Sequence, residues 1–150
     1  MEQEVYRRLP YDVEIEQALL GAILVDNYAL ERVSSTLKSE HFYDPLHGRI
    51  FEAIEHMAAK GQVITPLTLK AVMGEDPALV EVGGQAYLTS LAKAAPSIPS
   101  VAEYGRLLRD LGMRRDLILA RAPVDRVGVE QAPQFALILI QHAAVLRTMC

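Results

Sequence analysis

The run Glu16-Gln17-Ala18-Leu19-Leu20-Gly21-Ala22-Ile23-Leu24 carries the clearest structural pattern in the chain. Its apolar residues recur at the three-to-four-residue spacing of one helix face. Asp12 lies upstream, where it can cap the helix, and Glu14 and Glu16 fall in the first turn, where the helix dipole favours negative charge. Gly21 costs about 1 kcal/mol relative to alanine in mid-helix, and such a glycine usually lets another helix approach closely. We expect a buried helix with a close neighbour.

Further helix starts follow downstream. Asp44-Pro45 and Thr65-Pro66 each place a capping side chain before a proline at the first helical position. A helix is also expected over residues 29–37. Gly83-Gly84 reads as a turn that starts another helix, because no strand precedes it and no lysine follows it as in a phosphate-binding loop. The buried faces of these helices are expected to carry Leu46, Ile50, Ile54 and Met57, then Leu69, Val72 and Met73, then Tyr87, Leu88 and Leu91.

The pattern changes after Pro96-Ser97-Ile98-Pro99, because two prolines three residues apart cannot both lie inside regular structure. Ser100 and Glu103 then form a capping box. Apolar residues recur from there as far as Ile118. A helix is therefore expected over residues 101–121, with a length of roughly 30 Å at 1.5 Å per residue.

A last helix is expected over residues 133–149, after a break at Pro123 and Gly128. The predicted fold class is all-α, with a compact multi-helix head over residues 1–99 and a long αα-hairpin over residues 100–150. A hairpin with this much exposed leucine and isoleucine is expected to bury itself against another copy, so we predict that it mediates oligomerisation.

The composition agrees with a helical domain and limits its chemistry. The 150 residues fit one domain, or one small domain with an appended element, and 51% hydrophobic residues with 6% aromatic and no Trp suit helix packing. A net charge of −4 argues against non-specific nucleic-acid binding, which requires Lys and Arg to neutralise phosphates. Residues 106–126 nevertheless hold six arginines against three aspartates, which indicates either a solvated helix face or a weak docking surface.

No motif for catalysis or cofactor binding stands out. Nothing matches the P-loop pattern G-x-x-x-x-G-K-[ST], so we expect no ATP site, no other cofactor and no catalytic residue. The single cysteine, Cys150, fits a reducing compartment. Residues 1–10 lack the apolar core of a signal peptide, and the longest apolar run, Phe135–Ile140, is too short to span a bilayer. We therefore expect a cytoplasmic protein.

Three histidines lie within sixteen residues: His41, His47 and His56. Glu52 and His56 form an i,i+4 pair, but a metal site would need at least one more ligand at a compatible spacing, and H-E-x-x-H is absent. We expect no metal site, since such histidines usually cap helices, bind backbone carbonyls or face solvent. His47 is expected to hold its helix against the Phe42-Tyr43 segment.

Three sequence blocks in this order and spacing resemble one family: residues 16–24, residues 41–47 (HFYDPLH) and residues 83–88 (GGQAYL). Over residues 9–121 the chain resembles the N-terminal domain of DnaB-type replicative DNA helicases. The family-like positions of structural importance are Gly21, Phe42, His47, Gly83 and Gly84.

The resemblance implies an assembly and docking role in DNA replication. In the family these domains form a collar, often a trimer of dimers, above a hexameric motor ring, and the collar receives primase. The ATP- and magnesium-dependent 5'–3' motor lies further along such chains and is missing here. The implied partners are other copies of the chain and a primase or helicase loader, with no direct nucleic-acid or membrane contact. The candidate interface residues are Tyr87, Tyr104, Leu107, Leu111, Ile118 and Leu137.

Two other interpretations stay open at this point. After Arg121 the recognisable family pattern is lost, so the chain is expected to be either a domain cut from a longer protein or the product of a diverged gene. One alternative is a stand-alone regulator of prophage origin that mimics the collar and binds a helicase, loader or primase. The other is an unrelated helical binding protein or small enzyme that uses the histidine-rich region.

Overall fold

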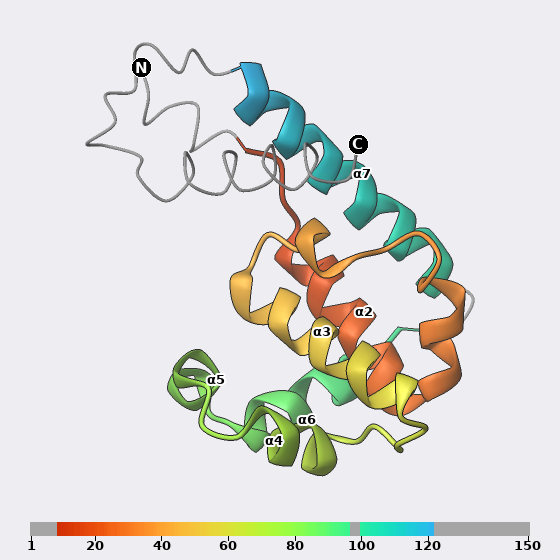
Figure 1. Ribbon diagram of the computed structural model, residues 1–150, viewed down its shortest axis with the longest axis vertical. Helices are drawn as coiled ribbons and strands as arrows, with labels where there is room; N and C mark the ends of the chain where they lie inside the picture. The colour runs from red at the N-terminus through yellow and green to blue at the C-terminus, as the bar shows by residue number, and fades with distance from the viewer. Residues whose placement is uncertain (1–8, 97–99, 122–150) are drawn as a thin grey trace, which may run out of the picture. The chain divides into compact units, whose positions relative to one another are not determined.

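The structure is a computed structural model, and it describes residues 9–96 and 100–121. The described residues are helical and contain no strand, which confirms the all-α fold class. Figure 1 shows the elements in chain order. They are the α-helix α2 (Val13–Val25), the 3₁₀ helices η1 (Asn27–Arg32) and η2 (Ser39–His41), and the α-helices α3 (Pro45–Ala59), α4 (Pro66–Met73), α5 (Pro77–Val82), α6 (Gln85–Lys93) and α7 (Val101–Arg121).

Residues 10–116 form one compact unit, which holds the head and most of α7. From residue 117 onward α7 belongs to a second unit. The expected last helix over residues 133–149, and with it the second half of the hairpin, lies outside the described residues.

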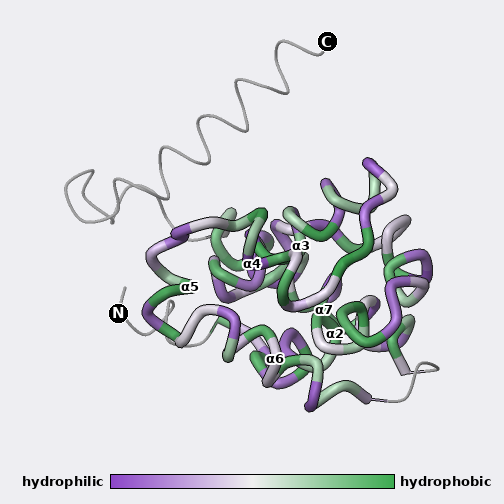
Figure 2. The backbone as a smooth tube through the Cα atoms, turned by 90° about the horizontal axis from the view of Figure 1, so that it is seen from below, coloured by the Kyte–Doolittle hydropathy of each residue, from purple (hydrophilic) through white to green (hydrophobic). Residues whose placement is uncertain are grey.

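Helix α2 lies at the centre of this unit and packs mainly against α6, with further contacts to η1 and α3 (Figure 1). Asp12 caps it as expected, since its carboxylate accepts a hydrogen bond of 3.1 Å from the Ile15 N–H. Hydrophobic positions dominate the helix (Figure 2), and Leu19, Leu20 and Ile23 have no exposed surface.

The close helix approach predicted at Gly21 is confirmed. A Cβ added there would lie 1.9 Å from the Leu91 carbonyl oxygen of α6, well inside van der Waals contact. The glycine therefore allows α2 and α6 to approach backbone to backbone, and this packing offsets its poor helix propensity.

Helix α3 agrees with the sequence prediction, and α4 agrees in part. The Asp44 cap and Pro45 start α3, and its four predicted face residues are all buried: Leu46, Ile50, Ile54 and Met57. In α4 Leu69 is buried and Met73 packs on the core. The prediction for Val72 was wrong, because it is 48% exposed. An eight-residue helix on the edge of the core buries only the narrow stripe around Leu69.

The predicted α-helix over residues 29–37 was wrong. The segment forms η1, a short 3₁₀ helix, and then turns from Val33 onward. Asp26 caps the start of η1, since its carboxylate accepts from the Tyr28 N–H at 3.0 Å. The side chain of Asn27 accepts from the Ile64 N–H at 2.9 Å and donates to the Ile64 carbonyl at 2.8 Å. This pairing ties the segment to the loop before α4. After Val33 come two serines and Thr36, whose side chains compete with helical backbone hydrogen bonds.

Helix α7 has the predicted bounds, and one of its faces packs on its own head. Gly105 approaches so closely that an added Cβ would lie 2.6 Å from Val33 Cγ1, and one at Gly112 would lie 2.9 Å from the His41 Cα. The buried positions recur every three or four residues: Val101, Gly105, Leu108, Gly112 and Arg115. We expected apolar faces of this helix to be satisfied only by sister molecules. The structure corrects this for the inner face, because it completes the core of the head.

Replacing Gly21 with alanine should destabilise the domain despite alanine's better helix propensity. The added methyl group overlaps the Leu91 carbonyl, and we expect a loss of about 2 kcal/mol in the free energy of unfolding, as is typical of overpacking. Urea denaturation followed by circular dichroism measures it. Gly48→Ala in α3 is the control: its Cβ would lie 3.0 Å from the Ser39 carbonyl oxygen, so its loss should be smaller. A Gly21→Ala variant as stable as the parent would contradict the close contact.

Candidate functional site

A fully buried carboxylate, that of Glu16, joins α2 to the start of α3. One oxygen accepts from the Tyr43 N–H at 2.6 Å, and the other accepts from the Asp44 N–H at 3.2 Å and from His47 Nδ1 at 2.9 Å. A buried carboxylate is tolerated when such donors satisfy it. The helix dipole alone does not predict this role of Glu16, although its spacing from Leu19, Leu20 and Ile23 puts it on the buried stripe.

His47 extends this network to α6. Its Nε2 lies 2.6 Å from the Tyr87 hydroxyl, and the Gln17 amide donates to the same hydroxyl at 3.4 Å. A neutral imidazole with its proton on Nδ1 satisfies all of these bonds, with Tyr87 donating to Nε2. His47 does lie against the Tyr43 segment as expected, but Glu16 mediates the link. We define Glu16, His47, Tyr87 and Gln17 as the buried network.

Arg115 ties α7 to the same region. Its guanidinium is buried and donates to the Pro10 carbonyl at 2.9 Å and to the His41 carbonyl at 2.6 Å. It also lies 5.7 Å from the centroid of the Tyr43 ring, which stacks on Tyr11 with the centroids 4.3 Å apart. The prediction of a solvated face or docking surface is wrong for Arg115, because this residue is buried. It continues the three-to-four-residue pattern of the inner face, which is formed by Val101, Gly105, Leu108 and Gly112.

The predicted interface residues of α7 lie along one flank of the helix, beside its buried face. Their spacing of three, four and seven residues forms a continuous stripe, which we call the α7 stripe: Tyr104, Leu107, Leu111 and Ile118. Leu107 is 39% exposed, whereas Tyr104 and Leu111 are half-buried and pack partly on the core. Arg114 lies between Leu111 and Ile118 on the same flank, at the three-to-four-residue spacing. The stripe is thus a mainly apolar, partly exposed surface.

The other predicted residues have more local roles in this structure. Tyr87 is half-buried, and its hydroxyl belongs to the buried network. Phe42 is buried against Phe51, with ring centroids 5.2 Å apart. Gly83 and Gly84 have φ values of 118° and 62°, and Gly84 starts α6. Leu137 lies outside the described residues.

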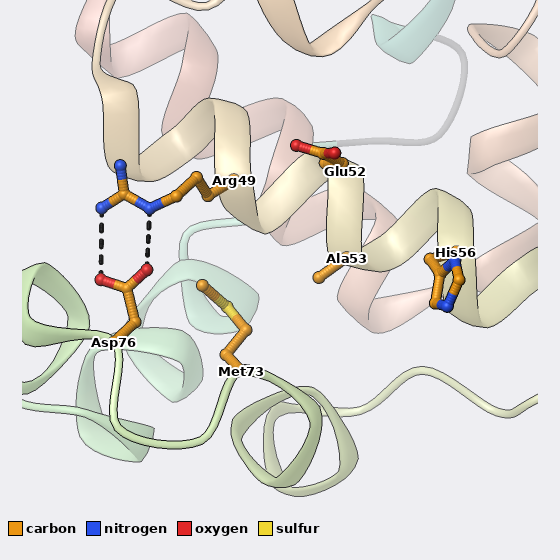
Figure 3. Close-up of a pocket in the computed structure, with 6 residues that line it drawn as sticks. All are labelled: Arg49, Glu52, Ala53, His56, Met73 and Asp76. Atoms are coloured by element: carbon orange, nitrogen blue, oxygen red, sulfur yellow. Dashed lines mark hydrogen bonds and ion pairs between the residues drawn. The ribbon is translucent and has the colours of Figure 1, made fainter.

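A groove of about 320 Å³ opens between α3 and the α4–α5 turn (Figure 3). Arg49 spans its rim and donates to Asp76 through Nε at 2.7 Å and Nη2 at 3.2 Å. These bonds hold the pKa of Asp76 below its usual range. Asp76 also caps α5, so the pair joins α3 to α5 and serves the fold. The groove is lined by Arg49, Glu52, Ala53, His56, Met73 and Asp76.

The histidines do not build a metal site in the part of the chain that the structure describes. No group of three or more His, Cys, Asp or Glu side chains is placed there to hold a metal ion. His41 and His47 are buried and take part in separate hydrogen bonds, while His56 is exposed at the groove. Within residues 9–96 and 100–121, every helix is too short or too polar to cross a membrane.

Comparisons with known proteins agree with one another. The family model described as DnaB-like helicase N terminal domain matches residues 8–110. Replicative DNA helicase DnaB of Rickettsia felis is 41% identical over 112 residues, which are 75% of this chain and 23% of that protein. The Geobacillus stearothermophilus protein of the same name is 32% identical over 130 residues, or 87% of this chain and 29% of that protein. The chain thus spans roughly a quarter of the length of these curated relatives.

Among solved structures, the chain is similar to the N-terminal domain of DnaB helicase from Mycobacterium tuberculosis. The TM-score is 0.68 at 25% sequence identity, and the match covers 83% of this chain and 96% of that one.

Removing the Glu16 carboxylate should be strongly destabilising. Glu16→Leu leaves the N–H groups of Tyr43, Asp44 and His47 without their acceptor, and we expect a loss of about 3 kcal/mol or more. Glu14→Leu is the matched control, because Glu14 lies in the same first turn of α2 but is exposed. Its replacement should change the free energy of unfolding by about 0.5 kcal/mol or less. Equal effects of the two variants in urea denaturation would show that the network contributes little.

Burial lowers the pKa of His41 below its ordinary value, although Glu40 and Asp116 partly oppose the shift. The neutral form therefore favours the folded state, and this contribution falls as the pH drops below about 6.5, where the unfolded chain takes up the proton. Between about pH 7.5 and pH 5 the parent should lose more stability than His41→Asn, whose side-chain oxygen can still accept from the Lys38 N–H. Parallel pH profiles of the two proteins would contradict this.

Proposed function

The chain belongs to the family of DnaB-like helicase N-terminal domains, and on this premise we propose that it is an assembly and docking domain for DNA replication. In this proposal copies of the domain associate through the α7 stripe into a dimer or a higher collar. The domain performs no ATP hydrolysis of its own, and the motor activity belongs to the longer helicases that it resembles.

The observation that carries this proposal is the division of α7 into two faces. Its inner face packs on the head. The exposed part of Leu107 and the flank around it therefore remain available for contact with another copy. Apolar side chains in a row along a helix are the pattern by which two helices pack side by side. Arg114 interrupts the row, and a charged position within such a seam can fix the register of two helices.

We further propose that a primase or a helicase loader docks on the assembled domains in the cytoplasm, where replication proceeds. The support is the family membership. The Tyr87 hydroxyl is engaged by His47 and Gln17, so a contact with such a partner would use the exposed part of its side chain.

Replacing Leu107 with aspartate should dissociate the assembly and leave the fold intact. A charge placed in the apolar stripe is expected to raise the dissociation constant by about tenfold or more, which corresponds to 1.4 kcal/mol. Sedimentation velocity over a range of concentrations measures the change, and circular dichroism checks the fold. Val63→Asp is the matched control, because Val63 is 70% exposed on the loop before α4. A strictly monomeric parent protein, or a Leu107→Asp variant that associates normally, would contradict the proposal.

A further inference from the structure

We propose that Arg115 is a positioning residue that fixes how residues 101–116 of α7 lie on the head and thereby places Tyr104, Leu107 and Leu111 of the α7 stripe for association. The inference rests on the proposed function, since it concerns the helix through which copies associate. The charge pattern alone does not distinguish Arg115, because the basic segment 106–126 holds five other arginines.

The contacts of Arg115 reach two segments that are far apart in the sequence. Its two terminal nitrogens donate to the Pro10 carbonyl and to the His41 carbonyl, 105 and 74 residues away along the chain. A planar guanidinium can hold two acceptors at a fixed angle, which a lysine ammonium cannot do in the same way. Arg115 therefore fixes α7 against the segment before α2 and against η2 at the same time.

The guanidinium is held in a place where burial is costly. Its side chain belongs to a residue only 8% exposed, and the partners of its two hydrogen bonds are uncharged. Burial lowers the pKa of Arg115, opposed by the charges of Glu16 and Asp116. Such a cation is tolerated only where its surroundings are well organised. The surroundings are organised here, because Glu16 holds the Tyr43 N–H and the Tyr43 ring lies beside the guanidinium.

The position of Arg115 along α7 makes these contacts important for the placement of the helix. It is the last buried residue of the helix among those whose burial is described, and Gly105 and Gly112 let the preceding turns lie close to the head. Leu111 precedes it by four residues and Ile118 follows it by three, so both are its neighbours on the helix surface. A change in the tilt or rotation of α7 at Arg115 would thus displace Leu111 and the rest of the stripe that lies on the head.

Distance measurements between spin labels test the positioning of α7 by Arg115 independently of association. Labels are attached at Val63→Cys on the head and Met113→Cys on α7, in a Cys150→Ser background; both positions are exposed. Excess unlabelled protein restricts the signal to distances within one copy. We expect Arg115→Met to broaden or shift the distance distribution, and Arg109→Met, which replaces an exposed arginine of the same helix, to leave it unchanged.

Sedimentation of the same variants, unlabelled, tests the consequence. Arg115→Met should weaken association by at least tenfold while the thermal unfolding curve stays cooperative, and Arg115→Lys should recover only part of the loss. If Arg115→Met does not fold, the distances in Arg115→Lys decide the question. Unchanged distances and unchanged association in a folded variant would overturn the inference. If the parent is monomeric and the distances change in the Arg115 variants, the proposed function is refuted, but the positioning role of Arg115 is supported.

Discussion

The buried carboxylate of Glu16 is the interaction on which the rest of the head depends. It is an acceptor for the backbone of the 43–44 segment and for His47, so it fixes the start of α3 against α2. Through Tyr87 the same network reaches α6, the main neighbour of α2. Because an unpaired buried carboxylate is very costly, these donors must all be in place together. The network thereby selects one arrangement of the helices that apolar packing alone would leave less defined.

The buried network also affects the position of α7. The segment that Glu16 holds includes Tyr43, which in turn lies against the Arg115 guanidinium. Helix α7 thus completes the hydrophobic core with one face and presents a mainly apolar flank beside it. In the function that we propose, α7 is positioned by the fold of its own head before it meets another copy. That division of one helix between core and interface underlies the function we propose.

Local sequence signals predicted most helices, because their caps and apolar spacing act over a few residues. The Asp44-Pro45 start, the bounds of α7 and the close approach at Gly21 are of this kind. Local signals did not identify which distant segments meet. Asn27 at the start of η1 pairs with Ile64, 37 residues away, and the partners of Glu16 and Arg115 lie 27 or more residues away. For both charged residues the apolar periodicity signals burial, whereas their charge alone indicates only a helix dipole contact for Glu16 and a solvated face or docking surface for Arg115.

The central claim is that the α7 stripe is the surface on which copies of this chain meet. Methyl-resolved NMR during dilution tests it most directly, because it reports each leucine, isoleucine and valine separately. The account predicts that methyl signals of Leu107, Leu111 and Ile118 shift as the complex dissociates, while those of the exposed Val63 and Val80 stay in place. Shifts confined to Val63 and Val80, or no shift at any concentration, would contradict it.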